Sequence, residues 1–288
     1  MGTSSSYKGP TGTTSLLPPW ADVPPETPAT PPNQAVTPAA DGESEGGETP
    51  ADQPESVGGP PPRQVSWRAP KATITRYASG ASPSPRSTFR SYVRAHGGGR
   101  GASRASVAGR QSARGILGFL SDAARNGLAA AAERIGIRDL VGRDAQSVLA
   151  ALIDILAPEG ALLEDAAARV AVIDTMTELF DALDVETNGI GVLDRLSEND
   201  LAQTLEVCIC NVIEARFTQE LASRVEHAAI DVTEANRTLG EIRDYIRGVV
   251  ALDLEGKRLL DIDWNGSEGA SFIESWLAAA YAVLEEAE

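Results

Sequence analysis

The histidines and cysteines of this chain offer little for catalysis. Only two histidines occur, His96 and His227. His96 adjoins a run of glycines and His227 lies near the end of a predicted helix, so we expect solvated or helix-terminal roles for both. The two cysteines, Cys208 and Cys210, differ by about 200° in direction on a helix, so they cannot share a metal ion, and we expect them to be buried by packing. We therefore predict no catalytic residues, no metal site and no cofactor.

Acidic residues and glycines also lack a catalytic pattern. Glu206, Glu214 and Glu220 are of the type that acts in acid–base chemistry, but their sequence context is that of a solvated polar helix face. The glycine run GGGRG at 97–101 lacks the GK[ST] ending of a phosphate-binding loop, and we interpret it as a hinge. These patterns predict that the chain is not an enzyme.

A block of basic residues is the first indication of a binding function. Residues 63–143 contain 15 Arg and Lys against 3 acids, whereas residues 144–288 contain 9 bases and 30 acids. Such a block can contact phosphates with salt-dependent affinity, or it can neutralise the chain's own acidic half or an acidic partner. Protein contact is favoured, because the acidic half repels a polyanion at short range. The candidate contact residues are Arg100, Arg104, Arg110 and Arg114.

The amino terminus is a separate chemical handle. The small Gly2 favours removal of Met1, which leaves an unhindered glycine amine that a modifying enzyme can reach; an inert terminus is the alternative. The first residues also match the M-G-x-x-x-[ST] myristoylation pattern, but the Ala- and Arg-rich composition is typical of a bacterial protein and argues against lipidation. An apolar cluster follows in a region with no other core residues. We interpret it as a linear motif that docks in a partner's groove; an apolar spot in a flexible tail, without a partner, is the alternative. Its members are Leu16, Leu17, Pro18, Pro19 and Trp20.

Composition divides the chain into four segments. Residues 1–62 hold 14 of the 18 prolines, with runs of Gly, Ser, Thr and Glu, and such a composition buries too little apolar surface to fold. We predict a linear motif at 1–22, a disordered acidic Pro-rich linker at 23–62, a basic Gly/Arg/Ser-rich segment at 63–111 and an α-helical domain at 112–288. The chain has no disulfide framework, no secretory signal and no apolar run of the roughly 18–20 residues that a membrane span needs. We therefore expect a cytoplasmic protein without membrane contact.

Helical spacing of apolar residues dominates the chain after residue 110. It predicts an all-α helical bundle behind the long disordered N-terminal arm. Ser197 and Asp200 form a predicted capping box at the start of the longest helix. Within the basic segment, residues 71–78 alternate weakly like a strand, and residues 87–95 predict a short helix. Other expected helix starts are Ser112 and either Asp231 or Thr233, and the expected interruptions or ends are Gly127, Gly136, Pro158, Gly189 and Leu260.

Several stretches of the sequence resemble one known family. They are MGTSSSYKGPTGTTSLLPPWA at the start, SVAGRQSARGILGFL in the basic segment, and AAAERIGIRDLVGRDAQSVLAALIDILAPEGALLEDAAAR beyond it. The most specific parts are MGTS with LxPPWA, and the GRD…LxPxGxxxxDAxAR stretch from Gly142 to Arg169. This sequence resembles the QatB proteins of four-gene bacterial anti-phage defence systems of the Qat type. The resemblance covers most of the chain apart from residues 23–62.

The resemblance implies a subunit that acts beside three partners: a QatA-like P-loop ATPase, a QatC protein related to the QueC-like 7-deazaguanine synthases, and a TatD-like nuclease, QatD. Such synthase relatives are expected to link a deazaguanine base to a partner's N-terminal glycine, which here is Gly2. The Leu16–Trp20 cluster would serve as a docking element, while Tyr7 and Lys8 depart from the smaller residues expected there. The alternative is a nucleic-acid-binding adaptor whose Arg-rich segment brings the nuclease to phage DNA. The recognition context implied around Gly2 is Thr3, Ser4, Gly9 and Pro10.

Overall fold

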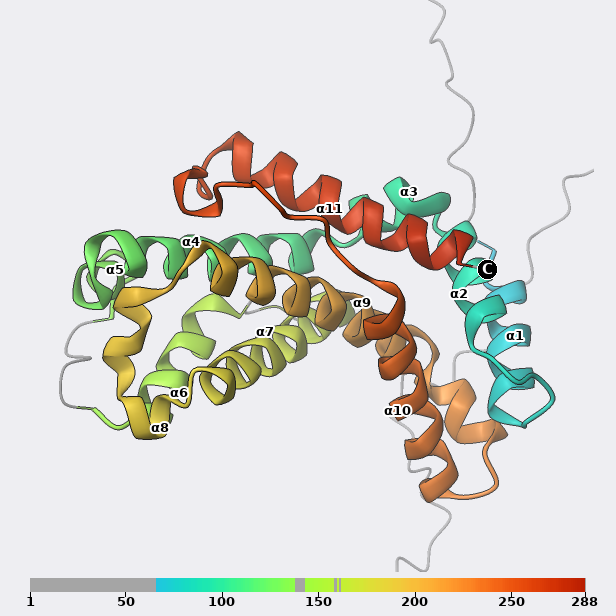
Figure 1. Cartoon of the computed structure of the whole chain (residues 1–288). Coiled ribbons are helices and arrows are strands. Elements are labelled where there is room, and N and C mark those ends of the chain that lie inside the picture. Colours follow the sequence, from blue (N-terminus) through green and yellow to red (C-terminus); the bar gives the residue numbers. More distant parts are fainter. Residues whose placement is uncertain (1–65, 138–142, 158–159, 161, 288) are drawn as a thin grey trace, which may run out of the picture. The chain divides into compact units, whose positions relative to one another are not determined.

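Helices make up the regular structure of every described segment. The computed structural model describes residues 66–137, 143–157, 160 and 162–287. Within these residues there are α-helices and short 3-10 turns but no strand, which confirms the all-α prediction (Figure 1). In chain order the helices are α1 (Arg68–Ala78), α2 (Arg86–Ala95), α3 (Gly98–Ala105), α4 (Val107–Asn126), α5 (Leu128–Arg134), α6 (Ala145–Leu156), α7 (Leu163–Ala182), α8 (Val185–Asn188), α9 (Glu198–Ala228), α10 (Val232–Val249) and α11 (Ser267–Glu286).

Three helices precede residue 112, where we expected the helical domain to begin. The predicted short helix at 87–95 is confirmed as α2. The strand tendency at 71–78 is wrong, because these residues lie in α1. Buried Ile74, Tyr77 and Ala78 recur at helical spacing, so a helix places all three on one face toward the core, whereas a strand would divide them between two faces.

The glycine run forms the start of α3, packed against α11, and is not a hinge. Gly97 and Gly98 adopt left-handed φ values of 88° and 82° where the chain turns into α3. A Cβ atom on Gly99 would lie 2.5 Å from the carbonyl oxygen of Ala278 and 2.9 Å from the nitrogen of Ala282. Glycine therefore allows α3 and α11 to approach backbone to backbone, and the hinge interpretation is wrong.

Local capping signals predict several helix boundaries correctly. The Ser197 nitrogen donates to Asp200 Oδ2 at 2.8 Å, and the Asp200 nitrogen donates to Ser197 Oγ at 3.2 Å, which is the predicted capping box of α9. Asp231 opens α10 by accepting from the Glu234 nitrogen at 2.9 Å. The breaks at Gly127 and Gly136 are also confirmed, with φ values of 86° and 87°.

Three predicted boundaries are wrong. Helix α4 begins at Val107, and Ser112 is buried inside it rather than capping it. Helix α7 ends at Ala182, before Asp184 takes a left-handed conformation, and α10 ends at Val249 rather than near residue 260. In the last case glutamates of α9 bind main-chain groups of the segment that follows α10, and this tertiary contact replaces helical hydrogen bonds.

Helix α9 is the central element of the described helices. It contains 31 residues and contacts α1, α4, α7, α10 and α11. Figure 1 shows α4 and α11 on one side of it, α6 and α7 on another, and α10 with α1 toward its C-terminal end. Because α9 is surrounded, buried residues follow most of its length, including Leu201, Ile213 and Val225. All the described helices belong to one compact unit.

Candidate interaction surfaces

The residues implicated in modification and docking lie outside the described residues, which begin at Ser66. These residues are Gly2, Thr3, Ser4, Gly9, Pro10, Leu16, Leu17, Pro18, Pro19 and Trp20.

Two of the predicted contact arginines bind one carboxylate of the chain itself. Arg110 Nη1 lies 2.5 Å from Glu274 Oε2, and Arg104 Nε lies 3.4 Å from Glu274 Oε1. Ser103 Oγ donates to the Glu274 carbonyl oxygen at 2.9 Å. The start of α4 and the end of α3 are thus joined to the middle of α11 by a charged and hydrogen-bonded contact.

Further basic residues bind the two ends of α11. Arg114 donates to the carbonyl oxygens of Trp264 and Asn265 at 3.1 and 3.0 Å, just before the helix begins. At the other end, Arg90 Nε donates to the Glu285 carbonyl oxygen at 3.2 Å, and Arg94 Nε lies 3.2 Å from Glu285 Oε1. A cation at a helix C-terminus also interacts favourably with the helix dipole.

These contacts show how the basic segment is used within the chain. Arg104, Arg110 and Arg114 hold α11, whereas Arg100 is exposed and has no hydrogen bond or ion pair to a described residue. One signal of this arrangement is present in the sequence. Glu274 and Glu285 are eleven residues apart, about three helical turns, so both lie on the same face of α11.

A buried polar cluster links α2, α3 and α9, and our sequence analysis did not predict it. His96 Nε2 lies 3.2 Å from Glu220 Oε2, and Glu220 Oε1 accepts from Arg216 Nε at 3.1 Å. Arg216 Nη1 donates to the Ala102 carbonyl oxygen at 3.1 Å and to Ser106 Oγ at 2.5 Å. The cluster is well paired, as buried charges need to be.

His96 is therefore not solvated, although it does lie at a helix end. Its side chain is 6% exposed, and the rings of Trp67 and Tyr92 pack edge-on against it at centroid distances of 5.1 and 4.9 Å. His227, in contrast, is exposed in the last turn of α9 as predicted. Burial alone would raise the pKa of Glu220, but the hydrogen bond from His96 and the charge of Arg216 lower that pKa below its usual range. The contacts favour an ionised Glu220 that holds three helices together.

The cysteines are packed into the core as predicted. Cys208 and Cys210 are both free and buried, and burial raises the pKa of each thiol to about 12. Such thiols stay protonated at neutral pH and are poor nucleophiles. Within the described residues, no group of three or more His, Cys, Asp or Glu is placed to hold a metal ion.

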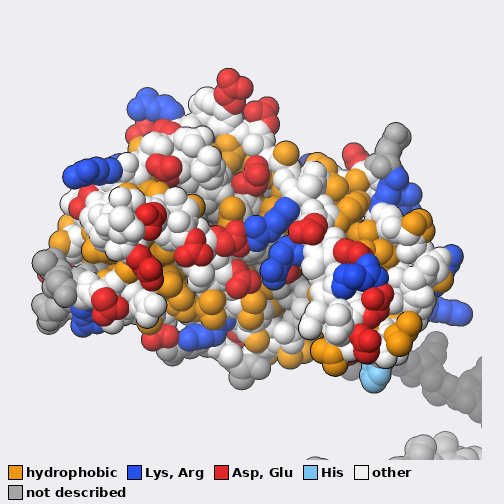
Figure 2. Space-filling model, turned by 60° about the horizontal axis from the view of Figure 1, so that its bottom comes forward, with side chains coloured by type: hydrophobic (Ala, Val, Ile, Leu, Met, Phe, Trp, Pro, Cys, Tyr) orange, Lys and Arg blue, Asp and Glu red, His pale blue; other side chains and the backbone are white. Residues whose placement is uncertain are grey.

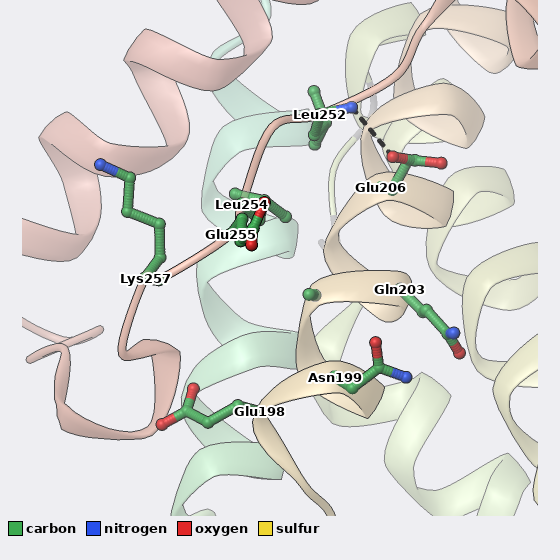
Figure 3. Close-up of a pocket in the computed structure, with 10 residues that line it drawn as sticks. Glu198, Asn199, Gln203, Glu206, Leu252, Leu254, Glu255 and Lys257 are labelled. Carbon is green, nitrogen blue, oxygen red and sulfur yellow. Dashed lines mark hydrogen bonds between the residues drawn. The ribbon is translucent and has the colours of Figure 1, made fainter.

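A groove of about 450 Å³ lies between the start of α9 and the segment after α10 (Figure 3). Two carboxylates of α9 attach that segment: Glu206 Oε2 accepts from the Leu252 nitrogen at 2.9 Å, and Glu198 Oε2 accepts from the Leu259 nitrogen at 2.6 Å. Glu206 thus binds a main-chain nitrogen of another segment, whereas we expected it to lie on a solvated helix face. Asn199, Gln203, Glu255 and Lys257 also line the groove, whose described lining contains no Ser, Cys or His.

Residues 97–284 match the model of a family described as QatB, Qat anti-phage system associated protein. A search of curated proteins and a search of solved structures each found no match. Separately, none of the described helices is long and apolar enough to cross a membrane. The family match spans α3 to α11 and well over half of the chain, and so the chain belongs to the QatB family and is a component of a Qat anti-phage defence system.

Proposed function

We propose that this chain is a non-catalytic adaptor that presents its N-terminal glycine for modification by the QueC-like partner. In this proposal a deazaguanine base becomes covalently attached to the Gly2 amine, while the helical domain binds the QatA-like ATPase. The observation that carries the proposal is membership of the QatB family, together with the MGTS and LxPPWA arm at the start of the chain.

The linker composition supports the presentation of Gly2. The predicted linker, residues 23–62, is Pro-rich and acidic, a composition that favours an extended spacer because proline stiffens a chain and like charges repel. An amine at the end of such a tether can enter a deep pocket while the helical domain stays outside. The Leu16–Trp20 cluster then has the role of a docking motif that raises the local concentration of the amine at the partner.

The contacts of the basic segment support an adaptor more than a nucleic-acid reader. Three of the four candidate arginines bind α11 or the turn before it, so their guanidinium groups already have partners within the chain. Only Arg100 among the four is free of such contacts with described residues.

Intact-mass measurement with N-terminal peptide sequencing tests the proposal. The full chain is expressed alone, with all neighbouring genes of the system, and with the same set lacking the synthase-like gene. We expect a mass increase that maps to Gly2 and depends on the synthase-like partner. A Gly2→Ala variant keeps a small residue after Met1 and controls for loss of the initiator methionine. An unmodified Gly2 in the presence of every neighbour contradicts the proposal.

A further inference from the structure

Helix α7 has apolar side chains on two opposite faces. Its inner face packs into the core through residues such as Ala168, Val172 and Met176. Its outer face carries a second row of mainly apolar side chains at alternating spacings of three and four residues, and all of them are exposed. We call this row the α7 stripe: Leu163, Ala166, Val170, Ile173 and Thr177.

The exposure of the stripe is unusual for a surface helix. Leu163 is 70% exposed, Val170 47% and Ile173 37%. Of the nine large hydrophobic residues that are exposed in the described part of the chain, five lie between residues 155 and 173. The outer face of a surface helix is normally polar, and a contiguous exposed apolar surface generally marks a contact site. Figure 2 turns the side that bears α6, α7 and α10 forward and shows hydrophobic side chains there among carboxylates and some Lys or Arg side chains.

The charges around the stripe are predominantly negative. Helices α6 and α7 together carry six acidic residues and a single base, Arg169. From α10, Arg247 binds Glu178 at 2.6 Å, and Arg243 lies near enough to Asp174 to offset part of the rise in its pKa that burial causes, so acids still outnumber bases on this side. Arg169 Nη2 lies 3.0 Å from Asp154 Oδ1, and the Asp154 side chain is 72% exposed. Two copies of this surface placed together would bring like charges together, and an anionic lipid surface would be repelled in the same way. The charge pattern therefore fits a basic partner.

We propose that the α7 stripe docks a basic amphipathic helix of another protein of the defence complex. From Leu163 to Thr177 the stripe is roughly 21 Å long, which matches about four turns of a partner helix. That helix would place apolar residues at i, i+3 or i+4, and i+7 against the stripe, with Lys or Arg beside them toward Asp154 and the acidic side chains of α7. The inference rests on the adaptor role proposed above and assigns the surface through which it acts.

Two matched glutamate substitutions test the stripe in the full chain. Val170→Glu places a charge in the middle of the stripe, and Val283→Glu places the same charge on α11, where the valine is similarly exposed at 43%. We measure the affinity of each variant for the purified complex of the neighbouring proteins. Val170→Glu is expected to weaken binding by about tenfold or more, while Val283→Glu leaves it unchanged. Equal binding by both variants and the parent chain overturns the proposal.

Photo-crosslinking provides a readout that does not depend on a destabilising substitution. A benzophenone amino acid replaces the exposed Thr177 in the full chain, which is co-expressed with all neighbouring genes. The expected product joins this position to a helical segment of another subunit, with an apolar stripe and flanking Lys or Arg. A crosslink to a second copy, a crosslink to residues 1–62 of this chain, or the absence of any crosslink overturns the proposal.

A charge reversal tests the basic character of the partner. Asp154→Lys is expected to weaken binding severalfold and to reduce its salt dependence, whereas Glu255→Lys, in the groove beside α9, serves as the control. Tighter binding by Asp154→Lys would contradict a basic partner. The mass of the N-terminal peptide, which reports modification of Gly2, is recorded in parallel. If Gly2 of the parent chain is modified and Val170→Glu binds unchanged, only the docking surface is rejected; if Val170→Glu loses binding and Gly2 of the parent chain is unmodified, only the proposed modification is rejected.

Discussion

Arg110 on α4 and Glu274 on α11 form a 2.5 Å ion pair between residues that are 164 positions apart in the chain. Arg104 binds the same carboxylate from α3. The contact shows that the basic segment and the acidic C-terminal half are oppositely charged surfaces of one fold. Part of the basic segment is thus used in contacts within the chain.

Replacement of Arg110 by alanine should destabilise the domain modestly. Because Glu274 is partly exposed and keeps Arg104 as a partner, we expect a loss of about 1 kcal/mol in the free energy of unfolding. Urea unfolding at low and high salt measures the loss, which should shrink as salt rises. Arg100→Ala is the control and should change stability by less than about 0.5 kcal/mol. Equal effects of the two variants would contradict a structural role for the Arg110 contact.

Two glycine-to-alanine variants should have opposite effects on stability. Gly99→Ala forces a Cβ atom against the backbone of α11 and should lower the melting temperature by several degrees, equivalent to about 2 kcal/mol or more. Gly240 lies inside α10 with no atom within 4 Å of the added Cβ, so Gly240→Ala should stabilise by about 0.5–1 kcal/mol. Thermal unfolding of both variants measures these changes. An unchanged melting temperature for Gly99→Ala would exclude the tight contact between α3 and α11.

The partly buried Glu220 should make stability depend on acid pH. Because its pKa is below 4.5 in the folded chain, its contribution is complete above that pH and is lost as the pH falls through the folded pKa. Glu220→Gln leaves the Arg216 guanidinium without its carboxylate and should cost on the order of 3 kcal/mol at neutral pH. The difference between variant and parent should shrink below pH 4.5, which urea unfolding across pH 3–7 can measure. A difference that stays constant over this range contradicts the ionised pair.

The two thiols should be unreactive in the folded chain. With pKa values near 12 and buried side chains, Cys208 and Cys210 should react with a thiol reagent at pH 8 only as fast as the domain opens. Labelling kinetics followed by mass spectrometry provide the measurement, with urea-unfolded protein as the positive control. Rapid labelling of either cysteine under native conditions would contradict the packing of α9.

Weak nucleic-acid binding is expected because most of the candidate arginines already have partners. Fluorescence anisotropy with a short DNA duplex should show little binding at physiological salt. Steep salt-dependent binding that is lost in Arg100→Ala would instead favour the nuclease-recruiting alternative. Lys257→Ala, in the groove beside α9, is the charge-matched control.

Predictions from the sequence succeeded where a few neighbouring residues determine the structure. The Ser197 and Asp200 capping box needs only residues three apart, and Gly127 breaks a helix through its own left-handed φ. Helical periodicity in α9 is likewise local, because one face repeats every three to four residues whatever the neighbouring helices are. The family resemblance likewise depends on short stretches of the sequence, and it was confirmed over residues 97–284.

The predictions that failed concern contacts between distant parts of the chain. A glycine run has the same composition whether it forms a hinge or packs against the backbone of another helix. The role of Gly99 depends on its contact with Ala278 of α11, which is distant in the sequence. His96 became buried because Glu220 arrives from α9, more than a hundred residues away. By itself the sequence determined the helical class, the capped starts of α9 and α10, the opposite charge of the two halves and the family. Tertiary structure decided which charges meet and which apolar face stays exposed, since both depend on side chains that only the packing of helices brings together.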